Sequence, residues 1–134
     1  MAGVLLDNEA VQALADPRHR KHRATLAIVQ MALGGRRQLE LVIPTSVQVE
    51  AGWDRSDPVA GPLNRLRTRR PSLDGPAADR AAAIVRALRI SVADAHIAEV
   101  LASPDGPDVV LTSDTDDLGR IVAHTGAHAR IVRL

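Results

Sequence analysis

The chain has 134 residues, which is long enough for one domain with a substantial core and too short for two, so we expect a single domain over residues 1–134. Hydrophobic residues make up 46% of the sequence but Trp53 is the only aromatic one, and the absence of cysteine excludes disulfides, thiolate nucleophiles and thiolate zinc sites. The net charge of +1 by itself predicts no binding to nucleic acid.

The first third of the chain alternates apolar runs with helical patterns. The expected elements are a strand at 4–6, a helix through 10–14, a long helix at 22–33 and a strand at 39–43. Asp7-Asn8 is a natural helix cap, although Asn8 can cap alone, Gly34-Gly35 ends the long helix, and Pro44 stops the second strand.

The rest of the chain continues the alternation. Thr45 can cap the next helix, with Gln48 completing a capping box. The remaining expected elements are a short helix near 63–69, helices at 77–89 and 91–101, a strand at 109–112, a short helix at 117–124 and a strand at 129–132.

Strands that alternate with helices predict a three-layer α/β/α sandwich with a central parallel sheet. In such folds the ligand crevice lies beyond the carboxyl ends of the strands. Asp7 and Asp114 follow predicted strands, whereas Glu50 and Asp94 lie on predicted helices.

Charge is distributed unevenly along the chain. Residues 94–117 hold seven acids and no Lys or Arg, while residues 18–37 hold six basic residues and no acid. A second basic cluster consists of Arg65, Arg67, Arg69 and Arg70. Such a separation of acidic and basic segments suits a metal-assisted enzyme that acts on a polyanion. Either basic cluster can equally be a solvated helix face.

Two acidic segments favour a metal site over purely structural roles. Asp94 falls on the apolar stripe of its helix, where a bound cation would stabilise the charged form of a buried carboxylate. Alternatively, Asp94 completes a capping box with Ser91. Residues 112–117 place three acids directly after a strand, where they repel one another without a counter-ion; alternatively Asp116 or Asp117 caps a helix from Leu118.

Other metal sites and catalytic motifs are absent from the sequence. The acids after the 109–112 strand lack the glycine and later glutamate of an EF-hand. The histidines show no His-Glu-x-x-His pattern, and we expect all five to be structural or surface residues. There is no glycine-rich phosphate loop and no clear nucleophile and base pair.

Four short segments in order resemble the PIN-domain family, especially the VapC-type toxins of bacterial toxin-antitoxin pairs. They are Val4-Leu-Leu-Asp7-Asn8, Ile43-Pro44 with Glu50, Ser91-Val-Ala-Asp94-Ala-His-Ile-Ala98, and Thr112-Ser-Asp114-Thr-Asp-Asp117-Leu118. The resemblance covers essentially the whole chain. One departure is Glu9, which stands where the family often has a small hydroxyl residue.

The resemblance implies a ribonuclease that holds one or two Mg²⁺ or Mn²⁺ ions. The acids carried over as catalytic are Asp7, Glu50, Asp94, Asp114 and Asp117, with Asp116 as the alternative to Asp117. Among these, Asp7, Asp94 and Asp114 are expected to ligate the metal. We expect substrate contacts from Thr112, which matches the family's hydroxyl beside the site, and from Arg65 and Arg67.

The expected reaction is hydrolysis of RNA phosphodiester bonds by metal-activated water, which requires no protein nucleophile. The resemblance further implies a homodimer and a cognate antitoxin. We expect a cytoplasmic protein with no membrane span. The alternatives are a catalytically weak PIN-like module that regulates through a protein or nucleic-acid partner and, less favoured, a Mg²⁺-dependent phosphatase or phospho-acceptor domain.

Overall fold

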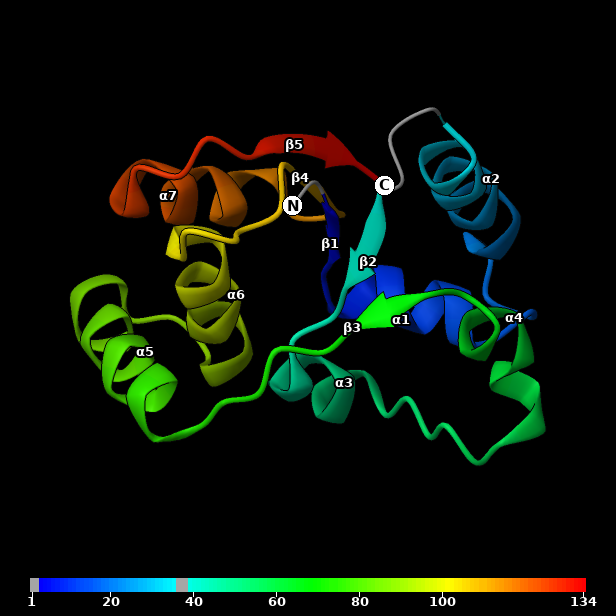
Figure 1. The fold of residues 1–134 in the computed structure, drawn as a ribbon, viewed down its shortest axis with the longest axis horizontal. Coiled ribbons are helices and arrows are strands. Elements are labelled where there is room, and N and C mark those ends of the chain that lie inside the picture. Colours follow the sequence, from blue (N-terminus) through cyan, green and yellow to red (C-terminus); the bar gives the residue numbers. More distant parts are fainter. Residues whose placement is uncertain (1–2, 36–38) are drawn as a thin grey trace.

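The computed structural model describes residues 3–35 and 39–134 (Figure 1). In chain order the elements are β1 (Gly3–Leu6), α1 (Asn8–Ala15), α2 (His22–Leu33), β2 (Glu40–Val42), α3 (Thr45–Ala51), a 3₁₀ turn (Pro58–Ala60), α4 (Gly61–Asn64), β3 (Thr68–Arg69), α5 (Gly75–Leu88), α6 (Val92–Ala102), β4 (Val109–Thr112), α7 (Thr115–Thr125) and β5 (Arg130–Arg133). Two members of the basic run at 18–37, Arg36 and Arg37, lie outside the described residues.

The five strands form one sheet in the order β3-β2-β1-β4-β5, and every neighbouring pair is parallel. Figure 1 shows α5, α6 and α7 on one side of the strands and α1, α2 and α4 on the other. Because both faces are covered, the central strand β1 carries no polar side chain, and all four of its residues are buried. The predicted α/β fold with a central parallel sheet is confirmed.

The core is aliphatic, as the composition requires. Fully buried side chains include Leu5 and Leu6 of β1, Leu111 of β4 and Ile121 of α7. Trp53 is also buried at 4% exposure, and its indole N–H donates a hydrogen bond of 2.9 Å to Asn64 Oδ1. The indole therefore has its polar partner inside the fold and presents no open face for stacking.

The predicted capping box at Thr45 is wrong. Pro44 occupies the cap position of α3, and no side chain caps that helix. The Thr45 hydroxyl instead accepts a hydrogen bond of 3.3 Å from the backbone N–H of Leu73, and the Gln48 amide donates to the carbonyl of Trp53. Both polar side chains are therefore hydrogen-bonded to groups outside the predicted cap.

The predicted short helix near 63–69 is present but with other bounds, because α4 spans Gly61–Asn64 and the chain then forms β3. Thr68 and Arg69 pair with Leu41 and Val42 of β2 at the edge of the sheet. The Arg69 side chain donates to Glu40 at 3.0 Å, which ties this edge strand to its neighbour. Sheet pairing at this position overrides the weak helical pattern.

Across residues 3–35 and 39–134, no helix combines the length and the apolar character needed to cross a membrane.

Candidate metal centre

The topology creates a crevice where β1 and β4 lie side by side. From β1 the chain proceeds to β2 on one flank, and it enters β4 only after returning from β3 across the sheet. The connections therefore diverge at the carboxyl ends of β1 and β4, which is where ligands bind in open α/β sheets. Asp7 follows β1 directly, and Ser113 and Asp114 follow β4.

A cleft of about 310 Å³ lies at this point. We call it the acidic cleft; its lining residues are Asp7, Asn8, Glu9, Gln12, Glu50, Asp94, Ser113, Asp114, Asp117 and Leu118. Six of these ten residues are carboxylates and none is basic, and they come from chain segments far apart in the sequence. All five acids predicted as catalytic therefore line one cleft.

Asp7 is the most buried acid of the cleft, at 8% exposure. One carboxylate oxygen caps α1 by accepting from the backbone N–H of Ala10 at 2.9 Å, so Asp7 rather than Asn8 is the cap. The other oxygen accepts from the Thr112 hydroxyl at 2.6 Å and from the Ser113 backbone N–H at 3.3 Å. Burial raises the pKa of Asp7, and these hydrogen bonds offset part of the increase.

Thr112 is fully buried and is not among the residues that line the cleft. Its hydroxyl donates to Asp7 and accepts from the Asp114 backbone N–H at 2.9 Å, so it joins the two loops that carry these acids. The structure therefore places the hydroxyl predicted to contact substrate beneath the site, in a position to orient Asp7.

The Thr112→Val variant should show what this hydroxyl contributes. We expect the free energy of unfolding to fall by about 1.5 to 3 kcal/mol, because a buried hydrogen bond to a charged group is lost and Asp7 is left under-solvated. Urea denaturation measures the change. Thr112→Ser keeps the hydroxyl and should lose clearly less, so equal losses in the two variants would contradict the proposed link.

Asp94 and Glu50 approach the cleft from helices α6 and α3. The Ser91 hydroxyl caps α6 by accepting from the Asp94 backbone N–H at 3.1 Å, which confirms the predicted cap. The Asp94 side chain is half-buried, and its pKa is raised by burial first and then by the charge of Glu50, with smaller contributions from Asp117 and Asp7. These four carboxylates therefore share one electrostatic environment.

Helix dipoles explain some of these acids but not all of them. Asp7, Asp94 and Asp114 lie at the N-termini of α1, α6 and α7, where the positive end of the helix favours negative charge. Glu50 lies in the last turn of α3, at the unfavourable end of the dipole. No salt bridge to Glu50 occurs within the described ranges. Neither the helix dipole nor an ion pair therefore stabilises the charge of Glu50 at this position.

The third acidic segment forms the start of α7. The helix begins at Thr115 rather than at 117, because the Asp114 carboxylate caps it by accepting from the Asp117 backbone N–H at 3.0 Å. Asp117 lines the cleft and lies 3.7 Å from Arg120, whereas Asp116 is exposed and is not a lining residue. The geometry therefore favours Asp117 over Asp116 as the fifth acid.

The cleft supplies the ligand type that hard cations prefer. Its polar lining consists of carboxylate, amide and hydroxyl oxygens with no imidazole or thiol. The Asn8 Oδ1 atom is buried and has no hydrogen-bond partner among the described residues, so one more oxygen acceptor is available there. Within this same part of the chain, no three Asp, Glu or His side chains converge closely enough to enclose an ion as they lie.

The remaining predicted substrate residues lie elsewhere. Arg65 and Arg67 are exposed, on the segment that joins α4 to β3, and neither lines the acidic cleft. The residues that sequence reasoning did not single out are Gln12 and Ser113, which line the cleft. Ser113 had no signal beyond its place between two candidate residues.

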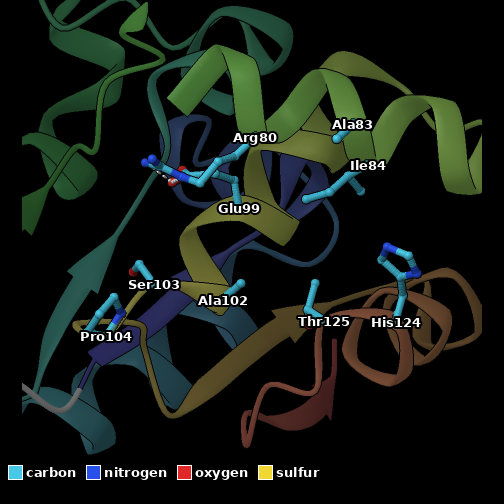
Figure 2. A pocket seen from close by; sticks show the side chains of 9 residues that line it. All are labelled: Arg80, Ala83, Ile84, Glu99, Ala102, Ser103, Pro104, His124 and Thr125. Carbon is cyan, nitrogen blue, oxygen red and sulfur yellow. Dashed lines mark hydrogen bonds and ion pairs between the residues drawn. The ribbon is translucent and has the colours of Figure 1, made fainter. Parts of the chain in front are cut away.

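A larger cavity of about 600 Å³ lies between α5, α6 and α7 and contains none of the predicted acids. Figure 2 shows the Arg80 and Glu99 pair at one end of this cavity and His124 and Thr125 at the other. Glu99 is 7% exposed, and its carboxylate accepts two hydrogen bonds from Arg80, the shorter 2.7 Å long. With this acid already paired and the other lining residues mostly apolar, the smaller acidic cleft is the better candidate for chemistry.

Comparison with known proteins adds no assignment: no protein-family model matches the chain, and no curated protein is significantly similar to it.

Proposed function

We propose that the protein is a Mg²⁺- or Mn²⁺-dependent endoribonuclease of the PIN-domain type. The observation that carries the proposal is the acidic cleft, where carboxylates from separate helices gather at the switch point of a parallel sheet with no basic residue in the lining. Mutual repulsion makes such a cluster unfavourable unless a counter-ion neutralises it. A divalent cation would neutralise it, and among the described residues Glu50 has no salt-bridge partner that offsets its charge.

Asp7, Asp94 and Asp114 would hold the cation, with Glu50 and Asp117 completing the ring. A bound cation supplies Lewis-acid stabilisation of the phosphate and lowers the pKa of an attacking water. The chain's own contribution is orientation: Thr112 and Ser113 fix Asp7, and Ser91 fixes the first turn that carries Asp94. Glu50 is exposed, so its side chain is free to turn toward an ion, and the exposed Asp114 carboxylate has a second oxygen, Oδ2, that does not cap α7.

RNA is the proposed substrate because of the resemblance to VapC-type toxins, and the same resemblance is the basis for proposing a cognate antitoxin, a homodimer and action in the cytoplasm. Because Trp53 is buried, base stacking on an aromatic side chain does not contribute to target choice. Recognition then depends on the shape and phosphates of the RNA.

A second candidate is a PIN-like binding module with little or no catalysis. It is favoured by the finding that, among the described residues, the acids as they lie do not enclose an ion. It is also favoured by Glu9, whose carboxylate pairs with Lys21 at 3.1 Å instead of being free for a metal.

Incubation with structured and single-stranded RNA separates the two candidates. We expect internal cleavage with Mg²⁺ or Mn²⁺, complete inhibition by EDTA, and recovery when excess Mn²⁺ is added back. Denaturing gels measure the products. Cleavage that EDTA leaves unchanged would contradict the metal-dependent mechanism, and no cleavage with either metal would favour the binding module.

A further inference from the structure

Glu9 is the cleft acid whose carboxylate has the nearer cationic partner. Its Oε1 lies 3.1 Å from Lys21 Nζ, and the two side chains are only 29% and 25% exposed. This contact holds Lys21 at the edge of the acidic cleft, because Glu9 is one of the residues that line it.

Lys21 belongs to a turn that is firmly attached to α1. His22 is buried, and its Nδ1 lies 2.7 Å from the carbonyl of Ala13. Within the turn, the Lys21 backbone N–H donates to His19 Nδ1 at 3.1 Å, and the His19 N–H donates to the Asp16 carbonyl at 3.0 Å. This turn, which joins α1 to α2 (Figure 1), thus has a defined conformation.

The turn and the first residues of α2 carry further positive charge. Arg20 and Arg23 are exposed, and neither forms a salt bridge within the described ranges; Arg18 is 90% exposed and lies 3.6 Å from Asp16. We call Arg20, Lys21 and Arg23 the basic turn. One member, Lys21, directly contacts a cleft acid, and the other two are exposed.

The other arginines are less suited to hold a strand beside the cleft. Arg69 is paired with Glu40, and Arg70 donates to Gln48 at 3.0 Å. Arg120 lies 3.7 Å from the cleft acid Asp117, but it also donates to the carbonyl of Leu88, and α7 contains no further Lys or Arg. Among the residues that the structure describes, the basic turn combines contact with a cleft acid and neighbouring cations.

A cleft with six carboxylates repels a polyanion, so the phosphates that flank the reacting one need cations just outside the ring. We propose that Lys21, held by Glu9, binds the RNA phosphate next to the one that is cleaved, and that Arg20 and Arg23 bind phosphates farther along the strand. Glu9 is then a positioning residue for Lys21 and not a metal ligand. The inference rests on the proposed function for its choice of RNA as the polyanion.

The test is fluorescence anisotropy of a labelled single-stranded RNA in EDTA, where cleavage does not occur, over a range of salt concentrations. Lys21→Met should weaken binding several-fold and reduce the slope of log affinity against log salt by about 0.7, the value for one lost phosphate contact on a single strand. Lys21→Arg keeps the charge and should keep the slope. Arg86→Met removes one exposed charge on α5, outside both the basic turn and the lining of the acidic cleft, and is the matched control.

An unchanged slope in Lys21→Met, or an equal loss in Arg86→Met, overturns the inference, provided that circular dichroism shows both variants folded. The result is independent of catalysis. If the wild-type protein binds RNA through Lys21 but does not cut it with Mg²⁺ or Mn²⁺, the nuclease proposal fails and this inference stands. If the wild-type protein cuts RNA and Lys21→Met leaves binding unchanged, the nuclease proposal stands and this inference fails.

Discussion

Asp94→Asn is expected to reduce RNA cleavage by about 100- to 1000-fold, the range typical for loss of one preorganised electrostatic group in an active site. The same change should leave the protein folded and, in EDTA, at least as stable as the wild type. The reason is that burial and the charges of Glu50, Asp117 and Asp7 raise the pKa of Asp94, so its ionised form is disfavoured without a cation. A neutral amide of similar size removes that repulsion.

The two measurements together distinguish a functional acid from a structural one. Cleavage is followed on denaturing gels with Mn²⁺ present, and stability by urea denaturation with EDTA present. Asp79→Asn, an exposed acid on α5 that does not line the cleft, is the matched control and should change neither quantity. Wild-type cleavage by Asp94→Asn would refute the assignment of Asp94, and lower stability in EDTA would contradict the repulsion argued from the structure.

The sequence was sufficient to predict the parallel sheet because the signals for β1, β4 and β5 are local. Apolar runs buried on both faces, such as Val109 to Thr112, need no partner to be recognised as strands. Most helix ends were equally local: Gly34 follows the last residue of α2, and Ser91 caps α6. Because carboxyl ends of parallel strands share one edge, Asp7 and Asp114 could be placed together in advance.

The errors and omissions involve partners that are distant along the chain. The Thr45 hydroxyl bonds to Leu73, and Thr68 and Arg69 form a strand only because β2 offers an unpaired edge. The Thr112 hydroxyl joins the Asp7 carboxylate across 105 positions, a contact that no local pattern contains. Likewise, the pairing of Glu9 with Lys21 depends on the turn after α1, so its effect on the cleft could not be read from the residue type alone.

Mn²⁺ is expected to stabilise the folded protein in a way that increases with pH. The pKa values of Asp7 and Asp94 are raised above the ordinary 3.8 by burial, so without metal the folded state binds protons more tightly than the unfolded state. The stability that these two carboxyl groups contribute is fully present below their ordinary pKa of 3.8, and it is lost as the pH rises through their raised pKa values. A cation competes with those protons, so it binds more tightly as the carboxylates ionise.

Thermal unfolding with Mn²⁺ and with EDTA, at about pH 4.5 and about pH 7, measures this linkage. Metal at a hundredfold excess over its Kd adds about 2.7 kcal/mol. For a domain of this size that is about 8 to 10 °C in Tm. We expect a larger shift at about pH 7 than at about pH 4.5, because protons compete with the metal for these carboxylates.

Burial lowers the pKa of His96, which makes stability fall as pH drops below 6.5, but that contribution is the same with and without metal and cancels in the difference. The Asp94→Asn variant should lose most of the shift and Asp79→Asn should keep it. A shift of equal size at both pH values, or one that Asp94→Asn retains in full, would mean that Mn²⁺ binds elsewhere; the repulsion among the cleft acids would then need an explanation other than a metal.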